Sequence, residues 1–195
     1  MNLNQLIERV RNILLNPKPT WETIKGETMP VAQIFKDYLV PLAAIPAVAM
    51  FIRGSLFGFS YGFGRFRQPI VSGLLGAVLS YVLTLVGIFI AGKVIDALAP
   101  TFGATKNDLN AFKVAAYCWT PALIAGVLSI LPLLGILGLL AGLYGIYLLY
   151  LGLLALMACP AEKVIGYTVV CVVVMIVINA LIGLCAGMVT GRMVK

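Results

Sequence analysis

Three long runs without a charged residue constrain this chain more than any other feature of its sequence. They cover residues 68–92, 114–161 and 164–191, with lengths of 25, 48 and 28 residues. About 20 apolar residues cross the hydrocarbon core of a bilayer, and charged side chains are costly at its centre. Because only 11% of the residues are charged, the chain cannot cover a soluble domain of this size with polar surface. The pattern predicts an integral membrane protein and excludes a soluble enzyme, a disordered chain and a nucleic-acid-binding module.

The charge-free runs divide into five transmembrane helices. The 48-residue run is too long for one crossing, and Leu131-Pro132 lies where a helical hairpin would turn, because proline ends the preceding helix. A shorter run at residues 38–52 can extend to Phe57 if the Arg53 side chain reaches the membrane surface. The expected spans lie near residues 38–57, 70–92, 114–131, 133–158 and 164–190.

The fold class that follows is an all-α integral membrane protein. We expect an amphipathic N-terminal helical segment at residues 1–37 and a five-span transmembrane domain at residues 38–195. With the N-terminus inside, the inner segments carry nine Lys and Arg residues and the outer segments carry five. Basic residues favour the inner side, so the N-terminus is predicted inside and the C-terminus outside. The main observation against this orientation is the outer cluster of Arg53, Arg65 and Arg67.

The first 37 residues lack the charged region and apolar core of a cleavable signal, so we expect them in the mature protein. Apolar residues recur at spacings of three and four near the start, which gathers them on one face of a helix. Trp21, in a second short helix, suits an anchor at the level of the lipid headgroups. The segment either lies on the inner membrane surface, where it could receive a partner, or packs on its own bundle. The candidate membrane-surface residues are Leu3, Leu6, Ile7, Val10 and Trp21.

Small residues form stripes on the last two predicted spans. Glycines that recur every three or four residues let another helix backbone approach closely in lipid. Packing within the chain is the first interpretation of these stripes, and a contact between two copies is the alternative. The candidate packing glycines are Gly135, Gly138, Gly142, Gly145, Gly183 and Gly187.

A few polar side chains fall inside the predicted spans and need partners there. A tyrosine hydroxyl or an amide in the membrane interior loses free energy unless it forms a hydrogen bond. We therefore expect a polar seam between helices, which either joins them or lines a small cavity. Its candidate residues are Tyr81, Thr84, Tyr144, Tyr147 and Asn179.

The residue types offer little for catalysis or metal binding. Histidine is absent, the four cysteines form no C-x-x-C pair, and every acidic residue lies outside the predicted spans. Lys93 and Asp96 are three residues apart and are expected to pair on one helix face. We expect no metal, no cofactor and no enzymatic activity.

Five stretches together resemble the bacterial branch of the Yip-one domain family. They are Asn16-Pro-Lys-Pro-Thr-Trp-Glu-Thr-Ile24, Ala116-Tyr-Cys-Trp-Thr-Pro121, Leu131-Pro132, Tyr147-Leu-Leu-Tyr-Leu-Gly152 and Glu162-Lys-Val-Ile-Gly-Tyr167. The resemblance implies a five-span protein with a cytosolic N-terminal segment, in the bacterial cytoplasmic membrane. Eukaryotic members bind prenylated Rab/Ypt GTPases in vesicle transport. This chain lacks their long N-terminal domain and their Asp-Leu-Tyr-Gly-Pro signature, so the resemblance does not imply that role here.

Two classes of function remain open from the sequence. The first is a non-enzymatic membrane scaffold that organises lipid or a partner protein through its N-terminal segment. The second is a small transporter or channel that uses the polar seam, either alone or as an oligomer. The expected partners are membrane lipid, a protein at the N-terminal segment and a second copy of the chain, but not nucleic acid.

Overall fold

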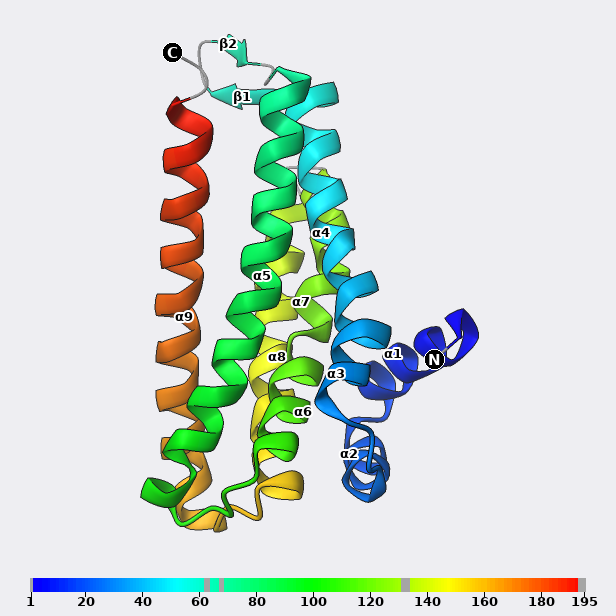
Figure 1. Cartoon of the computed structure of the whole chain (residues 1–195), viewed down its shortest axis with the longest axis vertical. Coiled ribbons are helices and arrows are strands. Elements are labelled where there is room, and N and C mark those ends of the chain that lie inside the picture. Colours follow the sequence, from blue (N-terminus) through cyan, green and yellow to red (C-terminus); the bar gives the residue numbers. More distant parts are fainter. Residues whose placement is uncertain (1, 62–63, 67–68, 131–133, 193–195) are drawn as a thin grey trace.

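The structure is a computed structural model that describes residues 2–61, 64–66, 69–130 and 134–192, without the side chains of residues 56–57, 59–61, 64–66, 135, 182 and 185–192. Five of its helical segments are long and apolar enough to cross a membrane. They run along the long axis of the molecule and alternate in direction (Figure 1). The prediction of an all-α protein with five spans is confirmed. The five segments are Val31–Ser55, Ile70–Phe102, Asp108–Ile130, Ile136–Leu156 and Ala161–Leu181.

Several of these segments combine regular α-helix with short π-helical or 3₁₀ turns. The first span contains two π-helical turns, and 3₁₀ turns follow the helices of the second and third spans. In chain order, the described elements are α1 Leu3–Leu15, α2 Pro17–Gly26, α3 Val31–Ile34, η1 Phe35–Leu39, α4 Val40–Ile52, η2 Arg53–Phe57, β1 Phe59–Tyr61, β2 Gly64–Phe66, α5 Ile70–Leu98, η3 Ala99–Phe102, α6 Asp108–Cys118, α7 Thr120–Ala125, η4 Gly126–Ile130, α8 Gly135–Leu156 and α9 Ala161–Arg192.

The helices of the first three spans reach beyond the boundaries that the charges suggested. The first begins at Val31 rather than at residue 38, directly after the extended Pro30. The second runs ten residues past its expected end and stops at Gly103, whose φ of 69° a residue with a side chain rarely adopts. The third begins at Asp108 rather than at residue 114, because the Asn107 side chain caps it. Caps, prolines and glycines in the polar region set the ends of these helices. The charged residues show only where the part of each helix in the hydrocarbon core ends.

The third span is broken near its middle. Helix α6 ends at Cys118, and α7 begins at Thr120 with Pro121 in its first turn. Proline fits a first turn because its missing backbone N–H is not needed there. The hairpin turn expected at Leu131 and Pro132 lies outside the described residues.

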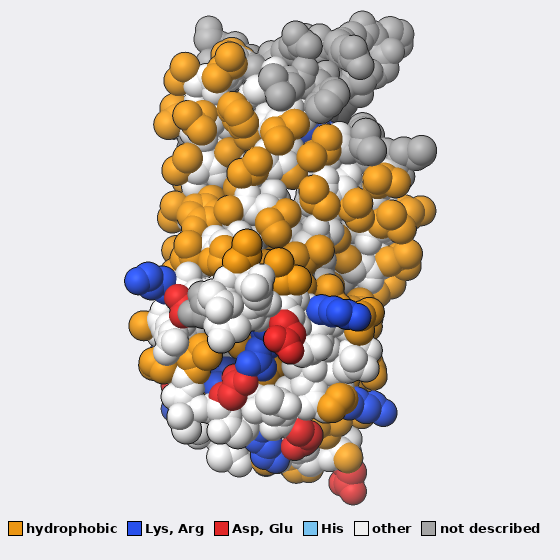
Figure 2. Space-filling view, turned by 90° about the vertical axis from the view of Figure 1, so that its right-hand side faces the viewer, with side chains coloured by type: hydrophobic (Ala, Val, Ile, Leu, Met, Phe, Trp, Pro, Cys, Tyr) orange, Lys and Arg blue, Asp and Glu red, His pale blue; other side chains and the backbone are white. Residues whose placement is uncertain are grey.

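Charged and apolar side chains occupy different levels of the molecule. On the face that Figure 2 shows, Lys, Arg, Asp and Glu gather toward one end, and a broad hydrophobic band lies beyond them. Helix α2 lies at the charged end and α1 lies beside the same half of the bundle, whereas the antiparallel β1–β2 pair and the last turns of α9 lie at the opposite end (Figure 1). An odd number of crossings therefore separates the N-terminal helices from the end of α9.

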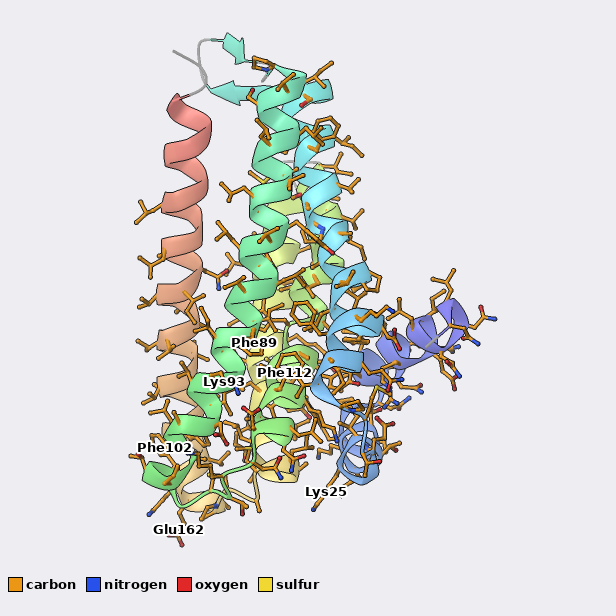
Figure 3. All side chains as sticks on the ribbon, in the orientation of Figure 1. Lys25, Phe89, Lys93, Phe102, Phe112 and Glu162 are labelled. Carbon is orange, nitrogen blue, oxygen red and sulfur yellow. The ribbon has the colours of Figure 1, made fainter. Side chains whose placement is uncertain are left out.

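Glycines outside the expected stripes let neighbouring helices approach closely. A Cβ atom on Gly92 of α5 would lie 3.2 Å from the Cα atom of Phe112 in α6. The Phe112 ring packs 6.0 Å from that of Phe89, and Figure 3 shows the two rings side by side. Gly126 approaches Pro46 of α4 in the same way, 2.9 Å from its Cα atom to where a Cβ would lie. Single glycines without a repeating neighbour gave no signal in the sequence.

Candidate functional site: the docked N-terminal segment

Local sequence signals set the ends of α1 and α2. The side chain of Asn2 accepts a hydrogen bond from the backbone N–H of Gln5, and the Gln5 side chain accepts one from the Asn2 N–H, both at 2.9 Å. This reciprocal cap starts α1. Asn16 ends α1, and Pro17 lies in the first turn of α2. The two helices therefore meet at a defined corner.

The apolar face of α1 divides into two edges. Leu6 and Ile13 are buried against the bundle, and Val10 packs half-buried beside them. On the other edge, Leu3 is 69% exposed and Ile7 is 57% exposed. The interpretation as a helix that packs on its own bundle therefore holds for one edge, while the other edge is open.

Trp21 of α2 is buried and is not a surface anchor. Its side chain is 1% exposed and its ring lies 6.0 Å from that of Tyr117, edge to face. Gly152 of α8 makes room for it, because a Cβ there would lie 3.0 Å from the indole ring. The prediction that Trp21 lies among lipid headgroups is wrong, since a helix that comes 131 residues later supplies its pocket.

Lys113 of α6 holds the end of α2. Its side chain is 1% exposed, and its Nζ atom donates hydrogen bonds to the carbonyl oxygens of Ile24, at 2.9 Å, and of Glu27. The last carbonyls of a helix lack partners within it and carry partial negative charge, which favours a cation. Lys113 therefore fixes the C-terminal end of α2 to the third span, where the sequence had suggested only a span boundary.

Arg9 of α1 forms an ion pair with Glu27, which ties α1 to the chain beyond α2. Its guanidinium carbon also lies 5.9 Å from the centre of the Tyr117 ring. Burial lowers the pKa of Arg9, but the hydrogen bond to Glu27 and the electrostatic interactions with Tyr117, Glu27 and Tyr38 together outweigh burial, and the pKa is raised. Arg9 is therefore a fixed cation in the corner between the two helices.

Tyr144 of α8 fixes the other end of α1. Its hydroxyl donates a hydrogen bond of 2.7 Å to the carbonyl oxygen of Leu14. Nearby, the hydroxyls of Tyr38 in the first span and Thr120 in the third are 2.7 Å apart and buried. We call the contacts of Lys113, Arg9 and Tyr144 with residues 14–27 the polar clamp.

A polar cleft of about 730 Å³ lies between α1, α2 and the start of the first span. Its walls carry amide and hydroxyl groups together with one acid and one base. The hydroxyls of Thr20 and Thr23 donate to carbonyl oxygens of α2 and its cap. The side-chain amides therefore offer most of the donors and acceptors that remain for a ligand in the cleft. The polar residues that line it are Gln5, Glu8, Arg9, Asn12, Asn16, Thr20, Thr23 and Gln33.

The expected polar seam does not form. Tyr144 bonds to α1, the Tyr81 hydroxyl bonds to the Val40 carbonyl at 3.1 Å, and the Asn179 amide bonds to the Met175 carbonyl of its own helix at 2.8 Å. Of the five, the rings of Tyr144 and Tyr147 lie together, with centres 5.8 Å apart, and Tyr147 is 41% exposed. Thr84 is half-buried, and no hydrogen bond joins it to the other four residues in the described structure. Backbone carbonyls on neighbouring elements satisfy two of these hydroxyls, so the side chains need not converge.

The glycine stripes pack only in part. A Cβ on Gly145 would lie 2.9 Å from the carbonyl oxygen of Cys118, so α8 approaches α6 closely there. At Gly138, Gly142 and Gly183, by contrast, nothing lies within 4 Å of such an atom. The interpretation of these three as packing positions within the chain is wrong. Gly135 and Gly187 lie outside the residues whose surroundings the structure describes.

Acidic and sulfur side chains do not gather into a reactive centre in the described part of the chain. Lys93 pairs with Asp108 at 2.6 Å rather than with Asp96, which lies on the buried side of α5. The described cysteines are free and buried, and burial raises the pKa of Cys159. Among the described residues, no three His, Cys, Asp or Glu side chains lie close enough to hold a metal ion.

Comparison with known proteins agrees with an integral membrane protein. Similar proteins include the inner membrane protein YohC of Escherichia coli K12 and that of E. coli O6:H1 (strain CFT073), each 25% identical over 125 residues. The match covers 64% of this chain and 64% of each relative's own length. No solved structure matches. The model of the Yip1 domain matches residues 11–182, which include Trp21, Glu27, Lys113 and Tyr144, and the chain therefore belongs to the Yip1 domain family.

Proposed function

We propose that this protein is a non-enzymatic membrane scaffold that organises lipid or a partner protein through its docked N-terminal segment. The polar clamp is the observation that carries the proposal. The hydrogen bonds of Lys113 and Tyr144 within it join residues 86 to 130 positions apart, from α6 and α8 to the N-terminal segment. A segment that served only as a tether would need no such attachment.

The free-energy cost of burying Lys113 supports the view that the position of the N-terminal segment matters for function. A buried ammonium group is unfavourable unless hydrogen bonds and opposite charge compensate it. Lys113 is compensated only while α2 stays in place, because two of its acceptors are the carbonyls of Ile24 and Glu27. The segment is thus presented as a rigid surface.

Two parts of that surface are open to other molecules. The exposed edge of α1, with Leu3 and Ile7, suits the boundary between headgroups and acyl chains, because α1 lies beside the charged half of the bundle. The amide-lined cleft on the other side of α1 suits a polar group, such as a lipid headgroup or a peptide backbone. A helix that contacts lipid on one edge and a polar ligand on the other can bring the two together.

The side-chain chemistry of the described residues supports a role without catalysis. They offer no cluster that could bind a metal, and the raised pKa of Cys159 disfavours its nucleophilic thiolate. A transporter that uses the polar seam is not proposed, because the seam residues bond at separate places in the structure.

We further propose that the N-terminal end faces the cytoplasm, in the inner membrane of a bacterium. The excess of Lys and Arg on the N-terminal side of the spans, nine against five, supports this orientation. The E. coli relatives are named as inner membrane proteins, which supports the location.

A photoreactive amino acid placed in the full-length protein tests the scaffold role in a native membrane. At Ile7 we expect adducts with lipid, and at Asn12 in the cleft we expect one discrete adduct with a protein or a headgroup. Val173, which is exposed on α9, is the control and should react with lipid acyl chains alone. If all three positions gave the same adducts, the N-terminal segment would organise nothing and the proposal would fail.

A further inference from the structure

An apolar groove of about 490 Å³ opens where α7, α8 and α9 meet. On the α8 side it is lined by Gly138 and Gly142, where nothing lies within 4 Å of the position a Cβ would take. The α9 side includes Ile176 and Asn179, both exposed. All four residues lie inside the candidate membrane spans, so this groove exposes helix backbone to the membrane.

Asn179 is a polar group in an apolar setting. It lies 16 residues beyond Lys163, or about 24 Å along the helix, and its exposed neighbours Ile176, Val177 and Leu181 are apolar. Its Nδ2 atom donates to the Met175 carbonyl, and its Oδ1 atom has no hydrogen-bond donor among the described residues. An unpaired amide oxygen in hydrocarbon is unfavourable, and acyl chains offer it no donor.

Trp119 also lines the groove, but its polar atom does not face it. The Nε1 atom of Trp119 is buried, so an occupant of the groove does not reach it. The groove therefore combines bare backbone with one accessible acceptor that lacks a donor, the amide oxygen of Asn179. Filling by an acyl chain would leave that oxygen unsatisfied.

We propose that a second copy of this chain occupies the groove, with α9 of each copy against α8 and α9 of the other. The partner must present a donor near the amide oxygen of Asn179. A carboxamide does so, and it is complementary to itself: two Asn179 side chains related by a two-fold axis exchange two N–H···O bonds. The open glycines allow the backbones to approach as closely as such short side chains require.

The second copy is preferred to another membrane protein because the groove and the amide lie on the same surface. In a two-fold dimer one surface supplies both halves of the contact, so the amide of each copy meets the other without a separate partner site. The proposal does not rest on the scaffold function, because the groove lies on α7–α9 and the clamp lies on α1, α2, α6 and α8.

The test is the oligomeric state of the full-length protein in liposomes, counted by single-molecule photobleaching over a range of protein-to-lipid ratios. We expect the wild-type chain to dimerise and Asn179→Leu to weaken association by about threefold to thirtyfold, the range typical of a hydrogen bond between membrane helices. Gly142→Leu should weaken it at least as much, because the new side chain fills the groove. The matched control is Val177→Leu, which lies about 160° around α9 from Asn179 and should leave association unchanged.

Oxidative cross-linking provides a second readout that does not depend on affinity. In a chain whose native cysteines are replaced, Gly183→Cys lies one turn beyond Asn179 and should form a disulfide with its copy, whereas Val177→Cys should not. A wild-type chain that stays monomeric at every ratio would overturn the proposal, as would cross-linking at position 177 but not at 183. Dimers that Asn179→Leu and Gly142→Leu leave intact would place the interface elsewhere and overturn it too. None of these results affects the adducts expected at the N-terminal segment.

Discussion

At the scale of single residues, the structure relies on side chains that bond to distant backbone carbonyls. Lys113 bonds to the end of α2, Tyr144 to the end of α1, and Tyr167 of α9 to the carbonyl of Ile95 in α5. Every residue carries a carbonyl, so the acceptor leaves no mark in the sequence. This explains why Lys113 could be predicted only as the end of a charge-free run, and why Tyr144 was expected to bond to another polar side chain.

Lys113→Met tests the contact with the end of α2. The substitution keeps much of the side-chain volume but removes the donor to the buried Ile24 carbonyl and to the half-buried Glu27 carbonyl, and a lost donor of this kind typically costs about 1–3 kcal/mol. We expect a lower melting temperature in detergent and faster trypsin cleavage after Lys25, because α2 detaches. Lys93→Met is the control: its ion pair with Asp108 is about half exposed, so its loss should change stability by less than about 1 kcal/mol. Equal effects of the two variants would contradict the clamp.

Of two glycines in α8, one is closely packed and the other is open. Gly152→Leu places a side chain against the Trp21 ring and should destabilise the protein by about 1–3 kcal/mol or more, as overpacking does. A Cβ on Gly142 has no atom of another element within 4 Å, so the side chain in Gly142→Leu extends into the open groove and should leave the melting temperature of the monomer in dilute detergent unchanged. Thermal unfolding of both variants decides the matter, since a large loss at Gly142 would mean that α8 is rotated relative to the structure.

At the scale of helices, the sequence predicts which segments form membrane spans better than it predicts where each span begins and ends. The five spans follow from charge-free runs because hydrocarbon excludes charge all along a helix. Their ends follow from local signals outside the membrane, such as Asn107 before α6, which the charge pattern does not contain. Amphipathic α1 was also predictable, but its periodicity could not say which of its apolar residues meets protein. Neighbours on α6 and α8 decide that, far along the chain.

The two edges of α1 should respond differently to a charge. Ile13→Asp buries a carboxylate in the bundle, and we expect it to release α1, lower the melting temperature and expose Arg11 to trypsin. Ile7→Asp lies on the open edge and should leave α1 docked. If Ile7→Asp destabilised the solubilised protein as much as Ile13→Asp, the exposed edge would in fact be buried.

At the scale of the whole molecule, the bundle is longer than a bilayer is thick. The second span with its 3₁₀ turn has 33 residues, whereas about 20 suffice to cross the hydrocarbon. The surplus lies at the charged end, where Figure 2 shows Lys, Arg, Asp and Glu side chains together with polar surface. The N-terminal helices are thus supported by a part of the bundle that stands in the headgroup region and beyond it.

Labelling of introduced cysteines tests the orientation of the molecule. In a chain without native cysteines, an impermeant reagent added to intact cells should react with a cysteine at position 195 and not with one at position 2, which becomes reactive only after permeabilisation. The reason is the odd number of spans together with the basic excess on the N-terminal side. Reaction at both positions from the same side would contradict five crossings.

The clamp also imposes an order on the making of the protein. Residues 14–27 leave the ribosome before Lys113 and Tyr144, which hold them and are synthesised 86 to 130 residues later. At translation rates of about 5–20 residues per second, the N-terminal helices wait several seconds for their docking site. An amphipathic helix is suited to that interval, since it can rest on the bilayer with its whole apolar face covered by lipid. If α1 contacts lipid as proposed, its inner edge exchanges lipid for protein when the fourth span is made, and its outer edge stays on the membrane surface.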